Sequence, residues 1–65
     1  MLYRLEFKRA NGSLLYALET TDYYMAKDHY TGADSNPEIV EVVWKTDYHD
    51  GKGMQEIMRR FTKHH

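Results

Sequence analysis

The feature that most constrains the fold is the dipeptide Asn11-Gly12, which separates two segments of alternating apolar and polar residues. Asn-Gly tolerates the positive φ values of a type I′ turn, so it predicts a β-hairpin with a two-residue loop. That loop length pairs Phe7 with Tyr16 and Leu5 with Leu18. The register gives one apolar face and one mostly polar face, as expected for a hairpin packed on one side.

Residues 23–30 are predicted to form a short helix after the hairpin. Several N-cap candidates precede it, the last of them Asp22, and a glycine that can end a helix follows. Tyr23, Ala26 and Tyr30 lie three and four residues apart, so they form a stripe that can pack on the apolar face of the hairpin. A helix this short requires such packing to be stable.

Residues 38–45 carry the strongest strand pattern after the hairpin, because they are rich in β-branched side chains. Val40, Val42 and Trp44 share one face of this strand and are expected in the core. The strand is expected beside either hairpin strand, in a three-stranded, mainly antiparallel sheet with the order strand, strand, helix, strand.

The segment 54–63 allows two interpretations. Its apolar residues recur at the spacing of an amphipathic helix. These residues are Met54, Ile57, Met58 and Phe61. The competing interpretation is a second hairpin, with Asp50-Gly51 in the turn and residues 55–61 as a fourth strand. Because Ile57 and Met58 are adjacent, strict alternation fails, and the pattern favours a C-terminal helix.

The expected fold class is therefore α+β, a small single domain over residues 1–65 with ββαβ order and an added C-terminal helix. A chain of 65 residues buries a core too small for a two-domain enzyme or a doubly wound nucleotide fold. The chain has no cysteine, which excludes disulfides and thiolate chemistry and favours a reducing, cytoplasmic location. No apolar run approaches the roughly 18 residues of a membrane helix, so no membrane association is expected.

Charge is unevenly distributed, although the formal net charge is −1. Residues 19–50 carry eight acidic and two basic side chains, whereas residues 51–65 carry four basic side chains and one acidic one. The acidic middle predicts a face that meets a basic surface on another protein, since complementary potentials speed encounter and select partners. The expected partner-binding residues are Asp22, Tyr24, Asp28, Glu38 and Glu41.

An alternative function class rests on the basic C-terminal segment. Arg59, Arg60 and Lys63 can contact phosphates, and Tyr48 can stack on a base. Nucleic acid is the less favoured partner, because cations near the end of an amphipathic helix need no ligand and the whole chain is not basic.

The densest cluster of chemically capable side chains is Asp47-Tyr48-His49-Asp50. The four histidines of the chain show none of the recurrent spacings of a structural zinc site, so no metal and no cofactor are expected. A small chain also has little material for the cleft of roughly 300 Å³ that a small-molecule site needs. The sequence therefore predicts a protein that is not an enzyme.

The favoured function is a small non-catalytic protein-binding module that blocks a macromolecular machine through an acidic, tyrosine-containing face. In being tiny, cysteine-free, tyrosine-rich and acidic in the middle, the chain looks like phage-encoded inhibitors of host machines, such as anti-CRISPR proteins and polymerase inhibitors. That likeness is one of size and character and involves no shared motif. The alternatives are a nucleic-acid-binding accessory protein and a structural homodimer formed by pairing of sheet edges.

Overall fold

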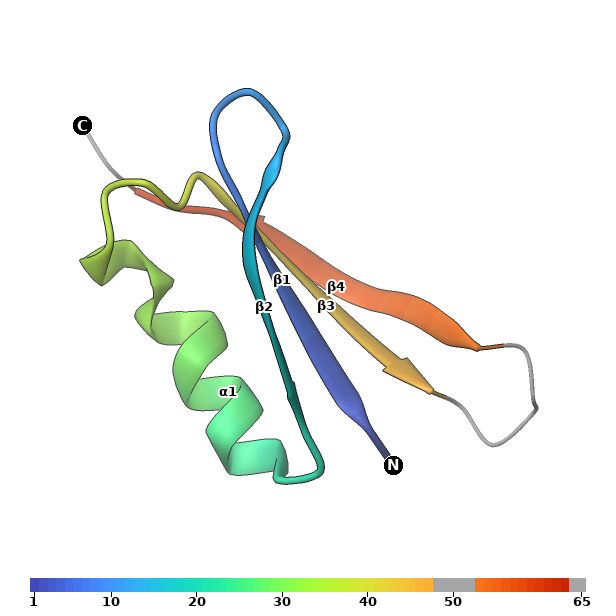
Figure 1. The fold of residues 1–65 in the computed structure, drawn as a ribbon. Helices are drawn as coiled ribbons and strands as arrows, with labels where there is room; N and C mark the ends of the chain where they lie inside the picture. The colour runs from blue at the N-terminus through green and yellow to red at the C-terminus, as the bar shows by residue number, and fades with distance from the viewer. Residues whose placement is uncertain (48–52, 64–65) are drawn as a thin grey trace.

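Residues 1–47 and 53–63, which the computed structural model describes, form one four-stranded antiparallel sheet with a single helix packed against it (Figure 1). The elements are β1 (Tyr3–Lys8), β2 (Leu14–Thr20), α1 (Tyr23–Thr31), the 3-10 turn η1 (Gly32–Ser35), β3 (Glu41–Asp47) and β4 (Met54–Phe61). The order of the strands across the sheet is β2-β1-β3-β4. The predicted α+β class is confirmed, whereas the prediction of three strands and a C-terminal helix is wrong.

The N-terminal hairpin forms with the predicted register over most of its length. Phe7 pairs with Tyr16, Leu5 with Leu18, and Tyr3 with Thr20. The loop between the strands differs from the prediction, because Gly12 has a φ of 85° and no other residue type in the described chain has a positive φ. A type I′ turn would require a positive φ at the preceding residue as well.

The hairpin loop therefore contains three residues, Ala10 to Gly12, and is closed by a bond of 2.9 Å from the Arg9 N–H to the Ser13 carbonyl. Within the loop, the Gly12 N–H donates to the Arg9 carbonyl, also at 2.9 Å. The longer loop brings Lys8 opposite Leu14 instead of Leu15. A β-bulge between Phe7 and Lys8, with Leu15 as the extra residue, restores the predicted pairing beyond it. The extra loop residue and the bulge thus compensate for each other, so the residues predicted to face the core still do.

β3 lies in the centre of the sheet, between β1 and β4. Trp44 pairs with Leu5 on one side and with Met58 on the other, and Val42 lies between Phe7 and Arg60 in the same way. The predicted three-stranded sheet would leave this strand at an edge, but β4 pairs with it on that side. Its β-branched side chains suit a strand that is paired on both sides.

The segment 54–61 forms strand β4, which pairs antiparallel with β3, so the strand of the competing interpretation is confirmed, whereas its turn at Asp50-Gly51 lies outside the described residues. A bulge makes Ile57 the extra residue between Glu56, which pairs with Lys45, and Met58, which pairs with Trp44. The adjacency of Ile57 and Met58, which argued against a strand, is explained by this bulge. The inserted residue gives the four apolar side chains of this strand the same spacing as an amphipathic helix.

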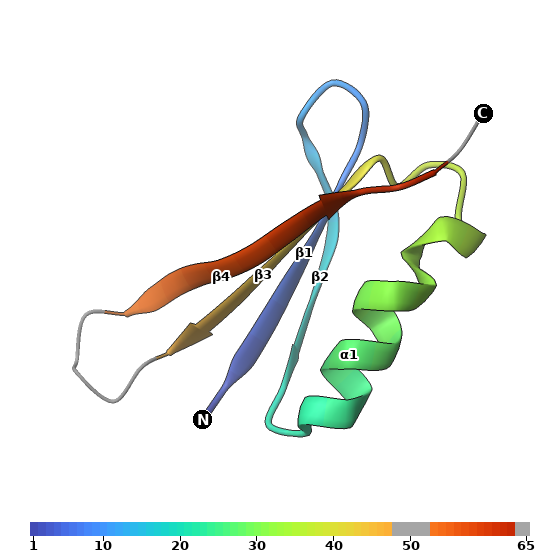
Figure 2. The ribbon, with the colours of Figure 1, turned by 180° about the vertical axis from the view of Figure 1, so that it is seen from behind.

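The helix packs on one face of the sheet, against β1 and β2 (Figures 1 and 2). Strand residues at alternate positions point toward it and form the helix face. The helix face consists of Tyr3, Leu5, Phe7, Tyr16, Leu18, Val42, Trp44, Met58 and Arg60. Ala26, Tyr30, Ala33 and Ile39 complete the core from α1, η1 and the segment before β3. A fully buried Leu or Phe contributes roughly 1.5–3 kcal/mol to stability.

The start of α1 is fixed by Asp22, whose Oδ1 accepts hydrogen bonds from the backbone N–H groups of Tyr24 and Met25. These bonds satisfy donors that the first turn of a helix otherwise leaves unpaired. The nine residues of α1 form the α-helix of the described chain, and that helix is too short to cross a membrane.

Candidate protein-binding surface

The first two turns of α1 expose two tyrosines, a methionine and two acids to solvent. We name this set the tyrosine surface, and it consists of Asp22, Tyr23, Tyr24, Met25 and Asp28. Three of the five residues expected to bind a partner, namely Asp22, Tyr24 and Asp28, are thus together on one short helix. Tyr and Met are enriched at the centres of protein interfaces, and polar residues at their rims.

Among the residues that the structure describes, Tyr24 has the most exposed of the large apolar side chains, at 74%, yet it packs against another ring. Its ring meets the ring of Tyr23 edge-on, with 5.5 Å between their centres. The centre of the Tyr23 ring in turn lies 5.6 Å from that of Trp44 and 5.9 Å from that of Tyr3. Aromatic pairs at such distances are favourable, so the contacts restrain Tyr24 although it faces water.

Helical spacing predicted that Tyr23 belongs to the buried stripe of the helix, together with Ala26 and Tyr30. The structure buries Ala26 and Tyr30 but leaves Tyr23 47% exposed. Position in the helical period could not separate these residues, because the exposure of each one depends on how α1 is placed on the sheet. Tyr23 is therefore a surface residue that the sequence pattern missed.

Trp44 is the centre of the aromatic cluster beneath the tyrosine surface. It is 2% exposed and also lies 5.4 Å from Tyr30. Its Nε1 atom is the buried side-chain polar atom that lacks a hydrogen-bond partner within residues 1–47 and 53–63. The rings of Tyr3 and Trp44 meet at 81°, with 5.9 Å between their centres.

The other two expected partner-binding residues lie elsewhere. Glu38 is exposed in the segment between η1 and β3. Glu41 is on β3, on the face of the sheet opposite α1, where its carboxylate binds Arg59 at 3.3 Å. The five predicted residues thus do not form one surface, because Glu41 is separated from the tyrosine surface by the thickness of the sheet.

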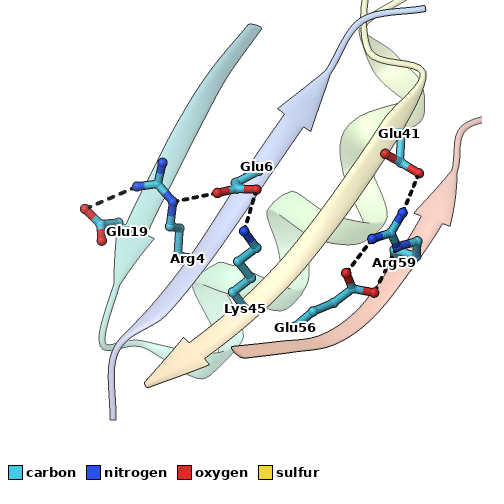
Figure 3. A network of polar contacts seen from close by, with 7 residues as sticks. All are labelled: Arg4, Glu6, Glu19, Glu41, Lys45, Glu56 and Arg59. Carbon is cyan, nitrogen blue, oxygen red and sulfur yellow. Dashed lines mark hydrogen bonds and ion pairs between the residues drawn. The ribbon is translucent and has the colours of Figure 1, made fainter. Parts of the chain in front are cut away.

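The face of the sheet opposite α1 is lined with charged side chains, and we call it the open face. It consists of Arg4, Glu6, Glu19, Glu41, Val43, Lys45, Glu56, Arg59 and Phe61. Figure 3 shows that seven of these residues form two groups of ion pairs, one centred on Glu6 and one on Arg59. Antiparallel sheets commonly have one face in the core and one in water.

The first group of ion pairs runs across three strands. The carboxylate of Glu6 accepts from Arg4 at 3.0 Å and from Lys45 at 3.1 Å, and Arg4 also meets Glu19 at 3.7 Å (Figure 3). Burial of Glu6 raises its pKa, but the hydrogen bonds and positive charges of Arg4 and Lys45 outweigh burial and hold that pKa below the ordinary value.

The second group has Arg59 between two acids, Glu41 and Glu56 (Figure 3). The hydrogen bond from Arg59 lowers the pKa of Glu56. Between the two groups lies Val43, which is 1% exposed although it points away from α1. Its register neighbours are Glu6 and Arg59, and the aliphatic stems of such side chains shield apolar atoms from water.

The residues of the predicted nucleic-acid site are not brought together. Arg59 is on the open face, whereas its neighbour Arg60 is on the helix face and binds Asp34 at 2.8 Å. Lys63 is exposed beyond the end of β4, and its backbone N–H donates to the carboxylate of Asp34. Tyr48 lies outside the described residues. Both arginines are therefore engaged by acids of the same chain.

No group of three or more His, Asp or Glu side chains suited to a metal ion occurs within residues 1–47 and 53–63. The same part of the chain encloses no pocket. Of the loop cluster around Tyr48, only Asp47 is described, and its Oδ1 accepts a hydrogen bond of 2.6 Å from the Leu2 N–H. Asp47 thus fastens the N-terminal end of β1 to β3.

Comparison of the chain with protein-family models, with curated proteins and with solved structures finds no match.

Proposed function

We propose that the protein is a small non-catalytic binding module that blocks a partner protein through the tyrosine surface of α1. The observation that carries the proposal is Tyr24, which is 74% exposed and is restrained by Tyr23 and, through it, by Trp44. A restrained aromatic side chain loses little conformational freedom on binding, so more of its contact energy appears as affinity.

The chemistry of the surface suggests what the partner offers. Asp22 and Asp28 lie beside the aromatic side chains, and one lysine, Lys27, lies among them on α1. A partner with an apolar pocket for Tyr24 and basic side chains at the rim of that pocket fits this arrangement. In that complex Tyr24 acts as the anchor and the two carboxylates fix the orientation.

Blocking is the mode of action that a module of this size best supports. A chain of 65 residues can cover about 800 Å² of a partner, the area of a standard interface per side. In the inhibitor class to which size and composition point, such coverage closes the partner's own binding channel. A partner channel that normally receives an acidic polymer would present the basic surface required.

The test uses affinity capture by the full chain from a lysate of its own organism, followed by titration against the purified captured protein. Tyr24→Ala is expected to weaken binding by about 30-fold, the effect of removing a strong interface anchor. Asp22→Asn with Asp28→Asn is expected to slow association, with the loss largest at low salt. Asparagine also caps helices well, so α1 stays intact.

The matched control removes the same charge elsewhere, by Glu19→Gln on β2 with Glu38→Gln before β3. Both residues are exposed acids outside α1. This double variant is expected to bind like the wild type. Equal affinity of the wild type and Tyr24→Ala would refute the proposal, and so would inhibition of the partner's activity by Tyr24→Ala at wild-type strength.

A further inference from the structure

Among the described residues, strand β4 is paired with β3 on one side only, so it forms an edge of the sheet. Three of its apolar side chains are exposed: Ile57 by 37%, Met58 by 47% and Phe61 by 65%. An edge strand presents a row of unpaired backbone N–H and C=O groups, which is a template for a further strand. The positions of these groups along β4 define what can pair with it.

Residues of an antiparallel strand alternate between bonding to one neighbour and bonding to the other. The N–H of Asp47 donates to the carbonyl of Leu2 at 3.2 Å, so Asp47 and every second residue before it bond toward β1. The intervening residues of β3 are Val42, Trp44 and Thr46. These three therefore bond toward β4.

Their partners on β4 are Arg60, Met58 and Gln55, respectively. The alternate residues on either side of the Ile57 bulge direct their N–H and C=O groups away from β3. These residues are Met54, Glu56, Arg59 and Phe61. Because of the extra residue Ile57, the middle two lie three positions apart, whereas each outer pair lies two positions apart.

We propose that β4 pairs with β4 of a second copy of the chain, antiparallel and across a two-fold axis near Ile57. A β-bulge sets two residues of one strand opposite one residue of its neighbour, so the four outward residues keep the spacing of a regular strand and lie opposite Asp47, Lys45, Val43 and Glu41 of β3. In a second copy, read in the opposite direction, the same four residues can therefore all pair at once. The side chains at these four positions are what favours a second copy as the partner.

The side chains agree with this register. Glu56 faces Arg59 of the partner subunit, and Arg59 faces Glu56 of the partner subunit, so two opposite-charge pairs form by symmetry. Met54 and Phe61, both apolar, face each other in the same way. The side chain of Arg59 remains 49% exposed and that of Glu56 37% exposed, which leaves surface on both for contacts between subunits.

This interaction surface is separate from the tyrosine surface, which belongs to α1 and lies over β1 and β2. The dimer therefore goes beyond the proposed partner binding, and it presents two tyrosine surfaces in one assembly. Two linked surfaces raise avidity for a partner that is itself a symmetric dimer.

The first test is sedimentation equilibrium of the full chain over a range of concentrations. The wild type is expected to shift from monomer to dimer as concentration rises. Arg59→Glu places two acids opposite each other across the axis, and Glu56→Arg places two arginines there. Each variant alone is expected to remain monomeric at concentrations where the wild type is dimeric, and circular dichroism checks that each is folded.

The decisive arm mixes the two variants in equal amounts. Across the axis, the glutamate introduced at position 59 of one chain then meets the arginine introduced at position 56 of the other. The unchanged Glu56 meets the unchanged Arg59, so both pairs become attractive. A heterodimer detected by native mass spectrometry is the expected result. Glu19→Arg reverses a charge on the opposite edge strand, β2, and is the matched control, which is expected to dimerise like the wild type.

If either variant fails to fold, amide hydrogen exchange of the wild type gives the same answer. The amides of Glu56 and Arg59 are expected to exchange more slowly at high concentration than after dilution, because they are bonded only in the dimer. A wild type that is monomeric at every concentration overturns the proposal. So does a dimer that both single variants leave intact, or a mixture of variants that stays monomeric.

Discussion

Arg60 donates a hydrogen bond of 3.0 Å to the backbone carbonyl of Tyr30, and its guanidinium lies 5.8 Å from the centre of the Tyr30 ring. It also binds Asp34 of η1. One side chain of β4 thus satisfies a carbonyl at the end of α1, pairs with η1 and covers an aromatic ring. This relationship joins the last strand to the helix.

Replacement of this arginine is expected to loosen the C-terminal end of α1. Arg60→Ala should lower the free energy of unfolding by about 1–3 kcal/mol, because it removes the hydrogen bond to the carbonyl of Tyr30 and the ion pair with Asp34. Arg60→Lys should recover only part of the loss, since an ammonium cannot make the forked contacts. Urea unfolding measures both effects, and an unchanged midpoint for Arg60→Ala would contradict this role.

Gly12 in the hairpin loop and Gly32 at the C-terminal end of α1 make a matched pair. Gly12 has a φ of 85°, whereas Gly32 has a φ of −86°, and both have open space where a Cβ would be added. Gly12→Ala is therefore expected to cost about 1–2 kcal/mol from backbone strain alone.

Gly32→Ala is expected to be neutral or to stabilise the protein by about 0.4–1 kcal/mol, because it restricts the unfolded chain without strain. Thermal unfolding of the two variants side by side separates the backbone effect from any effect of side-chain volume. A similar loss in both variants would contradict the assigned loop geometry.

Acid should remove the contribution of Glu6 to stability. Its carboxylate is only 14% exposed, and its pKa is lowered by Arg4 and Lys45. A carboxyl group with a lowered pKa stabilises the fold above its unfolded pKa, about 4.3, and that contribution is lost as the pH falls through the lowered value. Stability is therefore expected to decrease below about pH 4.

Glu6→Gln isolates this contribution. At neutral pH the variant should be less stable than the wild type by about 1–2 kcal/mol, and the difference should shrink as the pH falls. Glu38→Gln, at an exposed acid, serves as the control for the loss of one carboxylate. Parallel pH profiles for the wild type and Glu6→Gln, measured by urea unfolding, would exclude the ion-pair network as a source of stability.

The core is small enough that one truncation should unfold the chain. Leu5 is 0% exposed, and Leu→Ala at such sites costs about 2–5 kcal/mol. A domain of this size has roughly 3–5 kcal/mol of net stability. Leu5→Ala is therefore expected to be largely unfolded in water, whereas Leu14→Ala, at a residue 46% exposed, should remain folded. Fluorescence of Trp44, the one tryptophan, reports the difference.

Much of this fold was predictable because local signals agreed. Alternation on both sides of Asn11-Gly12 fixed which residues of β1 and β2 face the core, and Asp22 marked the start of α1. The loop type was not predictable, since a three-residue loop and a bulge at Leu15 give the same final register as a two-residue loop. Two compensating insertions leave no trace in the pattern of apolar residues.

The C-terminal segment shows how one inserted residue can reverse an assignment. With Ile57 as a bulge, Glu56 and Arg59 share the open face although they lie three positions apart, as they would on a helix. The decisive information lies in tertiary contacts. β4 pairs with the backbone groups on the side of β3 that faces away from β1, and Arg60 donates a hydrogen bond to the carbonyl of Tyr30. Neither relationship can be read from residues 54–61 alone.

The binding surface was predictable in part. Asp22, Tyr24 and Asp28 were recognisable as exposed helix residues, but the position of Glu41 relative to them depends on the sheet, which separates them. The support that Tyr23 gives to Tyr24 also required the structure, because Tyr23 matched the buried stripe of the helix.

The most direct test of the central claim places a photo-crosslinking amino acid at Tyr24 and, in a separate chain, at Ser13. Both residues are exposed, and Ser13 lies after the hairpin loop, away from α1. After capture and irradiation, the chain labelled at position 24 should form a single covalent adduct with the partner, and the chain labelled at position 13 should form none. Adducts of equal yield from both positions, or an adduct from position 13 alone, would contradict binding through the tyrosine surface.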